Sequence, residues 1–383
     1  MKKYIYGLLI IGSTTTVFAQ NNDALNVKNL SVPSTPGFSL LDVAPSSIDK
    51  PSNPKALGLS LLNISTSSAG FPKNFAFELC PYWLIKHKNE TPYKYFGIRN
   101  REDTNGLNVS SGILRKMSVS IVSVYNDSTS SLPSNTNFIS AGIRTNLLTV
   151  RTSRQANGIK RVMKEQAKQL GALSDALYKT GISSTDLANA IDNATTSTTD
   201  ANGIKYAKIQ KEMNDQLAQH PIFQIDVAGA YANGYQNNNY ENGRFFRGAA
   251  WVNACVSIPL SSSANVQKTY VNAIVMYKYL QQNILSDTVN NIYKATNAND
   301  LGIRIELELN NLIASFEYVN RTYAVETKLN GARRVGMIQY KINDKLSVYG
   351  TYGENFGSGE NLFTLFGLNF GIGQTSLKTD STN

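Results

Sequence analysis

Residues 300–319 alternate between apolar and polar side chains with a period of two, which is the period of a β-strand. Every odd position from 301 to 309 is leucine or isoleucine, whereas the even positions carry a glycine, an arginine and two glutamates. Asn310 and Asn311 then make a two-residue turn, because asparagine tolerates the positive φ that such turns need. Residues 312–319 continue both faces in the return direction. The stretch therefore predicts a β-hairpin with one oily face and one charged face.

Twelve segments in all have the length and composition of strands. They are 56–64, 73–86, 112–125, 136–149, 221–233, 245–259, 267–281, 300–309, 312–320, 335–342, 346–353 and 361–373. In the C-terminal half, short connections alternate with longer polar ones, as they do in outer-membrane barrels. A soluble sandwich would bury the oily faces, whereas a barrel in lipid turns them outward.

Tyrosines gather on the oily face just before the longer loops, which predicts an aromatic girdle at a membrane interface. These girdle residues are Tyr125, Tyr231, Tyr277, Tyr318 and Tyr352, with Trp83 at the opposite rim. The other face is polar along strand after strand, and its mixed signs allow pairing in a closed interior. The residues expected to line that lumen are Glu78, Arg144, Asp226, Arg247, Arg304, Glu306, Glu308 and Glu317.

Residues 1–19 have two lysines, a short apolar core and a Val-Phe-Ala end, which predicts a cleaved signal peptide. This start resembles the leaders of Gram-negative exported proteins, and its FAQ ending resembles those of the Bacteroidota. The final strand, LFTLFGLNFGIG, resembles the C-terminal strand of outer-membrane barrels, although a polar tail, 374–383, follows it. The resemblance covers 56–373 and implies an outer-membrane protein.

The expected fold is all-β: an antiparallel transmembrane β-barrel of about twelve strands with a periplasmic α-helical insert. The lead, 20–55, contains five of the eleven prolines and should be extended. Its few large apolar side chains could dock on the barrel, for example at the mouth; they are Phe38, Leu40, Leu41 and Val43.

The insert, 151–219, has apolar residues three to four apart, which predicts a helical hairpin. Its first half is basic, and these residues form either a solvated face or a docking surface for a partner. They are Arg151, Arg154, Lys160, Arg161, Lys164 and Lys168. The other functional interpretation of the insert is a plug across the periplasmic mouth of the barrel.

Residues with catalytic potential are few. The two histidines, His87 and His220, lack an evident carboxylate or cysteine companion in the sequence, so we expect no metal site, no cofactor and no catalytic residues. Cys80 and Cys255 fall in strands that are not neighbours, and we expect two buried thiols. The formal charge of +10 suits anionic lipid headgroups better than nucleic acid, because the chain is expected to be exported.

The leading functional hypothesis is a non-enzymatic outer-membrane barrel that acts as a narrow channel or as a component of an envelope complex. The alternative is a structural barrel whose periplasmic helical arm docks an envelope protein. An outer-membrane lipid hydrolase is the least favoured, because both histidines fall at the periplasmic rim. Outer-membrane lipid is the expected surrounding in each case, and nucleic acid is not an expected partner.

Overall fold

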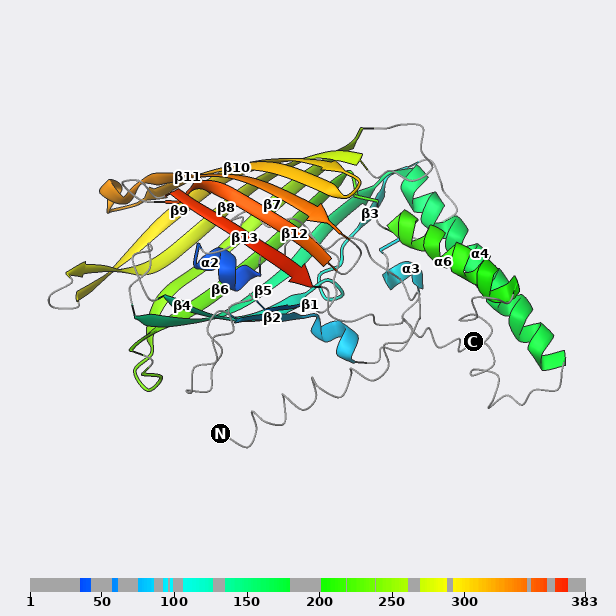
Figure 1. The fold of residues 1–383 in the computed structure, drawn as a ribbon, viewed down its shortest axis with the longest axis horizontal. Coiled ribbons are helices and arrows are strands. Elements are labelled where there is room, and N and C mark those ends of the chain that lie inside the picture. Colours follow the sequence, from blue (N-terminus) through cyan, green and yellow to red (C-terminus); the bar gives the residue numbers. More distant parts are fainter. Residues whose placement is uncertain are drawn as a thin grey trace. The chain divides into compact units, whose positions relative to one another are not determined.

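Thirteen strands of the part of the chain that the structure describes form one antiparallel sheet (Figure 1). The structure, a computed structural model, describes residues 35–42, 57–60, 75–85, 92–95, 97–98, 106–126, 135–179, 201–217, 219–237, 239–260, 269–287, 292–342, 346–356 and 362–370. The predicted signal peptide and polar tail, and most of the lead, lie outside these residues.

The strands are β1 (Leu57–Ser60), β2 (Phe75–Leu79), β3 (Asn108–Ser110), β4 (Ser118–Asn126), β5 (Thr136–Arg151), β6 (Phe223–Gln236), β7 (Arg244–Pro259), β8 (Thr269–Asp287), β9 (Ile292–Leu309), β10 (Leu312–Tyr323), β11 (Gly331–Lys341), β12 (Leu346–Glu354) and β13 (Leu362–Phe370). The helices are α2 (Pro36–Leu40), α3 (Pro92–Tyr95), α4 (Ser153–Lys179) and α6 (Ala201–Leu217), with two 3-10 helices, η2 (Pro81–Leu84) and η3 (Thr327–Leu329).

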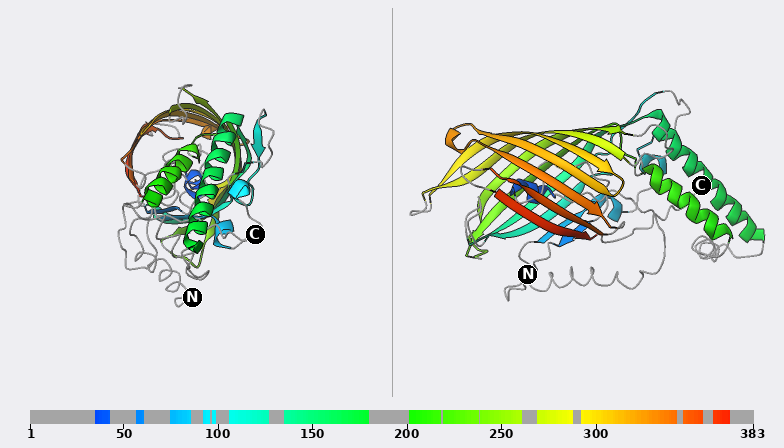
Figure 2. Two further views of the ribbon diagram at one scale, coloured as in Figure 1. Left: turned by 90° about the vertical axis from the view of Figure 1, so that its right-hand side faces the viewer. Right: turned by 45° about the horizontal axis from the view of Figure 1, so that its top comes forward.

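Each strand pairs with the next along the chain, except that β3 pairs with β5 and lies off the main path. The sheet is strongly curved, so that one face is concave and the other is convex (Figure 2). The two ends of the path, β1 and β13, approach each other to within 8 Å between Cα atoms. Local pairing of this kind is what a chain of consecutive hairpins produces.

The hairpin prediction at 300–319 is confirmed. Leu309 pairs with Leu312, and Asn310 between them has a φ of 52°. Each of the other predicted segments also contains a strand, whereas β3 was not expected.

The predicted ends of several strands are wrong. The expected loop at 282–299 is mostly strand, because β8 runs to Asp287 and β9 begins at Ile292. Likewise β10 and β11 extend into the expected loop at 321–334. Polar and apolar side chains do not alternate there, but backbone hydrogen bonds to a paired neighbour continue the ladder, and strand preference depends on that context.

The prediction of a strand over 73–86 is also too long, and it misplaced Trp83. The strand β2 ends at Leu79, and Pro81 begins η2, which contains Trp83. Proline has no N–H to give to a ladder, so it ends the strand before the tryptophan is reached. Trp83 therefore does not lie at the end of a strand.

The two faces of the sheet differ in exposure. Leu301 and Ile303 are 61% and 46% exposed, whereas Arg304 and Glu306, in the alternate phase of the same strand, are 4% and 1% exposed. The other odd positions from 305 to 309 are exposed as well. The apolar face is thus the outer, convex face, and the charged face is buried on the concave side.

The helical hairpin predicted within 151–219 is confirmed as α4 and α6. Residues 161–215 belong to a compact unit separate from the sheet. Within it the guanidinium of Arg161 contacts the carboxylate of Glu212, and the apolar side chains Val162, Ile209 and Met213 are buried. Among the described residues, helices that could cross a membrane are absent, since none combines the needed length and hydropathy.

Candidate functional site

The concave side of the sheet holds a short piece of the N-terminal lead, residues 35–42, which we call the interior segment (Figures 1 and 2). Its centre is the single turn α2, whose first residue, Pro36, has a φ suited to that position. The carbonyl of Thr35 accepts hydrogen bonds from the N–H groups of Phe38 and Ser39, at 3.0 and 3.1 Å. All eight residues are buried.

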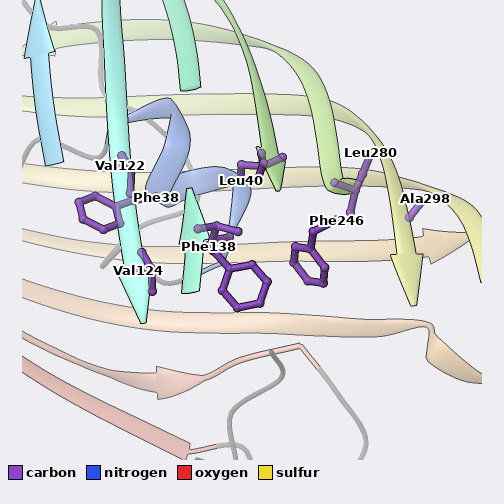
Figure 3. Close-up of a cluster of buried hydrophobic side chains, with 10 residues drawn as sticks. Phe38, Leu40, Val122, Val124, Phe138, Phe246, Leu280 and Ala298 are labelled. Carbon is purple, nitrogen blue, oxygen red and sulfur yellow. The ribbon is translucent and has the colours of Figure 1, made fainter. Parts of the chain in front are cut away.

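The interior segment packs its apolar side chains into an apolar patch of the concave face (Figure 3). Phe38, Leu40 and Leu41 are at most 4% exposed. They belong to one cluster with Val122, Val124, Phe138, Ala232, Phe246, Leu280 and Ala298. The expectation that Phe38, Leu40 and Leu41 dock on the barrel is therefore met by docking onto the sheet's inner face, while Val43 lies outside the described residues.

Two glycines allow the segment to lie close to the sheet. A Cβ on Gly142 of β5 would lie 2.6 Å from the Cβ of Pro36, and a Cβ on Gly37 would lie 2.7 Å from Cγ2 of Val122. Real Cβ atoms do not approach other carbons so closely, so any side chain at either position would push the segment away from the sheet.

The Asp42 carboxylate is the centre of a buried ion-pair network. Arg321 binds it with two nitrogens, Nη1 to Oδ2 at 2.7 Å and Nη2 to Oδ1 at 3.0 Å. Arg247 donates to the same carboxylate at 2.8 Å. The guanidinium of Arg321 also donates two hydrogen bonds to Asp300, at 2.7 and 2.9 Å, and Lys278 lies 3.3 Å from Asp300. Charged groups buried this deeply are tolerated only when paired.

The same cations bind the carbonyl groups at the end of the interior segment. Arg247 donates to the Leu40 carbonyl at 2.8 Å, and Lys278 donates to the Ser39 carbonyl at 3.3 Å. The Asp42 carbonyl accepts from Arg333 at 3.4 Å and from Asn355 at 3.3 Å. The end of a helical turn leaves carbonyls without partners in the helix, and here side chains from the sheet supply them.

The charge state of Asp42 follows from these neighbours. Burial of the carboxyl would raise its pKa, but the positive charges of Arg321, Arg247 and Lys278 outweigh burial and hold the pKa well below its ordinary value. Asp42 therefore stays ionised at mildly acidic pH, and the network keeps its central anion.

Most of the expected lumen-lining residues form pairs on the concave side. Glu78 binds Arg144 at 2.7 Å, Arg304 binds Glu306 at 2.7 Å, and Glu317 lies 3.4 Å from Arg333. Asp226 accepts a hydrogen bond from Asn146 at 2.9 Å, and Arg247 binds Asp42 as described above. The expected set is thus divided among several places on the inner face rather than gathered in one site.

A second place on the concave side is occupied by the connection that enters β6. His220 Nε2 lies 3.0 Å from a carboxylate oxygen of Glu308, and its ring meets Tyr270 edge-on. Lys341 lies 3.6 Å from the other oxygen of Glu308. The sequence offered no carboxylate companion for His220, because Glu308 is distant along the chain. His87 lies outside the described residues.

Arg151 was expected on a docking surface, and that expectation is wrong. It ends β5, is 6% exposed, and donates to the Gln219 carbonyl at 2.9 Å. Its position in the last pair of the β3–β5 ladder, opposite Asn108, directs it away from solvent. The rest of the basic set is on α4, where Lys160 is half-buried and the other side chains are exposed; these are Arg154, Arg161, Lys164 and Lys168.

The expected girdle tyrosines lie on the outer face. Tyr231, Tyr277, Tyr318 and Tyr352 are exposed, and Tyr125 is half-buried. Cys80 and Cys255 are buried and not bridged. Clusters of three or more potential metal ligands are absent from the described residues.

Sequence reasoning missed the centre of the network. Arg321 and Arg333 were assigned to a loop because the strands were ended too early. Lys278 and Asp300 were inside predicted strands and in the inward phase, so alternation alone could have found them. Asp42 lies in the proline-rich lead, where strand periodicity gives no signal.

No family model matches this chain, and no curated protein is significantly similar to it in sequence.

Replacing Arg321 with methionine should destabilise the protein far more than the same change at Arg334. The first change leaves Asp42 and Asp300 buried without their shared cation, which costs about 3–5 kcal/mol of unfolding free energy. Arg334 pairs with Glu354 at the surface, where both side chains are at least 40% exposed, and such pairs contribute about 0–1 kcal/mol. Denaturant unfolding of both purified variants measures the difference. Equal midpoints would show that the network contributes nothing to stability.

Proposed function

We propose that this chain is a non-enzymatic outer-membrane β-barrel whose interior is closed by its own residues 35–42, and that it serves as a component of the cell envelope rather than as an open pore. The observation that carries the proposal is the polarity of the sheet. Its outer face is apolar and exposed, whereas its charges are paired and buried on the concave side.

The length of the apolar outer run supports a membrane location. On β9 the exposed aliphatic side chains extend from 301 to 309, which is nine residues. A tilted strand crosses the hydrocarbon core in about 9–11 residues. In water, a face of this kind would be a large exposed apolar patch, which soluble monomers avoid.

The outer face changes character where the apolar run ends, which also supports the proposal. On β8 the exposed Tyr277 and Tyr279 are followed by Gln281, and on β10 Tyr318 is followed by Asn320. Tyrosines favour the headgroup level, with an apolar ring and a polar hydroxyl, and polar residues follow them into water. The strand extensions beyond the tyrosines fit this arrangement, since they carry the ladder past the bilayer surface.

Closure of the sheet between β1 and β13 is part of the proposal. Their Cα atoms approach to within 8 Å, whereas hydrogen-bonded strands are about 4.8 Å apart, so the proposal requires these two end strands to move together and pair. A closed sheet leaves no unpaired edge, which lipid would not tolerate, because its hydrocarbon core cannot hydrogen-bond the backbone.

The proposal of a closed passage, rather than an open one, rests on polypeptide that occupies the interior at two levels along the strands. The interior segment is bound near Asp300, and the connection through His220 is bound at Glu308, eight positions further along β9. Eight residues of strand span about 26 Å. Both levels lie within the length of one strand, so the interior segment obstructs the passage and the connection at Glu308 narrows it further.

The helical unit provides a second candidate function, docking of an envelope partner. The observation that favours it is the set of exposed cations on both helices, which includes Arg161, Lys164 and Lys168 on α4 and Lys208 and Lys211 on α6. They can attract an acidic protein surface over about 8 Å at physiological ionic strength.

A lysine in place of Ile303 should destabilise the protein in a bilayer, whereas a lysine in place of Val325 should not. Ile303 is next to the central outward side chain of the apolar run on β9, and a lysine near the bilayer midplane costs about 2–4 kcal/mol. Val325 is also exposed but lies between β10 and η3. Denaturant unfolding in lipid vesicles, followed by heat-modifiable gel mobility, compares the two. Equal stability, or a wild-type protein that stays in the aqueous fraction, would refute the membrane location.

The unmodified protein should show no steady conductance in a planar bilayer, whereas Asp42→Arg should conduct and prefer anions. The substitution adds a positive charge beside Arg247, Lys278 and Arg321, which repels the interior segment. The vacated level then has an excess of positive charge. Asp175→Arg, the same change on the exposed face of α4, is the matched control and should remain closed. Steady conductance by the unmodified protein would contradict closure.

Replacing residues 161–215 with a short Gly-Ser linker distinguishes docking from plugging. The deletion spares Arg151 and the connection through His220, so their contacts on the concave side are kept. If the helices dock a partner, the variant should lose envelope proteins that co-purify with the full chain while its conductance stays unchanged. Increased conductance with unchanged co-purification would assign the helices to the passage instead.

A further inference from the structure

We propose that the concave face contains a peptide-binding site that recognises a turn of two aliphatic residues followed by an aspartate, and that residues 35–42 are its built-in, exchangeable occupant. The inference rests on the proposed function, in which these residues close the interior. The inference adds the ligand that the site would accept from a partner, which is a peptide segment with the same chemistry as residues 35–42.

The described contacts of the interior segment come from eight residues and are all non-covalent. An apolar patch receives Phe38, Leu40 and Leu41, and small residues at Gly142 and Ser140 receive Pro36 and Gly37. Main-chain carbonyls are bound by Arg247, Lys278, Arg333 and Asn355. Recognition of carbonyl groups and of one carboxylate does not require that the peptide belong to the same chain.

The charge of the site specifies an anionic ligand. Around the segment, four cations of the sheet face two acidic groups of the sheet; the cations are Arg247, Lys278, Arg321 and Arg333, and the acids are Asp300 and Glu317. Asp42 contributes the third anion. When Asp42 leaves, the excess of positive charge in this buried place rises from one to two, and a carboxylate from another source lowers it again to one.

The bidentate geometry at Arg321 narrows the choice of ligand. Its guanidinium binds both oxygens of the Asp42 carboxylate and stacks over the Phe356 ring, with 3.8 Å between the guanidinium carbon and the ring centroid. Planar fork-to-fork binding of this kind suits carboxylates. Arg247 Nε is buried and has no acceptor among the described residues, so the site has a spare donor for a ligand with an additional oxygen.

The tether decides which ligands can compete. A segment attached to the same chain competes at an effective concentration on the order of millimolar. A free peptide of equal intrinsic affinity must therefore reach about that concentration to displace it. Selectivity follows, because only a partner held close to the barrel would exchange efficiently with the built-in segment.

The experiment uses a synthetic peptide of residues 35–42, TPGFSLLD, blocked at both ends so that the aspartate side chain is its only carboxylate. The receptor is the detergent-solubilised full chain lacking residues 35–42, and a fluorescent label on the peptide reports binding by anisotropy. We expect saturable binding, at least tenfold weaker for the Asp42→Asn peptide. In the same receptor, Arg321→Met should weaken binding at least tenfold, and the surface control Arg334→Met should leave it unchanged.

A second measurement uses the full chain and keeps the test valid if the shortened chain does not fold. Ser39→Cys places a thiol in the buried segment, and its rate of labelling by a soluble maleimide reports exposure, with the unmodified chain giving the background from Cys80 and Cys255. Millimolar TPGFSLLD should raise the labelling rate at least fivefold, and the Asn peptide should not. Equal effects of the two peptides, or no effect of either in both assays, would overturn the site. Because neither readout involves a bilayer, such a failure is distinct from a failure of the membrane location, which the Ile303→Lys comparison tests.

Discussion

The ion-pair network of Asp42, Arg321 and Asp300 is the constraint on which the interior depends. One guanidinium satisfies two carboxylates from different parts of the chain, and all three side chains are almost entirely shielded from solvent. Each member of such a network is tolerable only while the others are in place, because an unpaired buried charge is costly. The interior segment is therefore held on the inner face by specific contacts rather than being a loose tail.

Polarity is distributed unusually over the two faces of the sheet. In a water-soluble sheet protein the apolar faces pack together and the charges face water. Here the aliphatic side chains of β9 and β10 are exposed, and the concave side contains pairs such as Arg304–Glu306 and Glu78–Arg144. The inner face is not uniformly polar, however. Val122, Phe138 and their neighbours form an apolar patch that matches the apolar side chains of the interior segment.

Errors in the predicted strand ends and in the site have one physical origin. Periodicity marks a strand only where its two faces differ, and beyond the tyrosines of β8 and on the facing part of β9 apolar and polar side chains no longer separate in that way, since Leu280 and Ala298 are buried on the inner side beside polar Gln282 and Thr296. Backbone pairing of Gln282 with Thr296 continues there all the same. For this reason the predicted strand ends placed Arg321 and Arg333 in a loop, and neither was predicted as a site residue. The opposite error misplaced Trp83. The apolar run in the sequence continues through Pro81, but the hydrogen-bonded ladder of a strand cannot continue through a proline.

The sequence alone determined the local features: strands with alternating faces, the Asn310 turn, and a helical hairpin, because each depends on residues a few positions apart. It also marked the inward charges, but not their partners. Asp42 and Arg321 are 279 residues apart, and Glu308 and His220 come from different hairpins. No local pattern encodes such pairs. They exist only because consecutive hairpins curl into one sheet, whose concave face brings distant side chains within a few ångströms of one another.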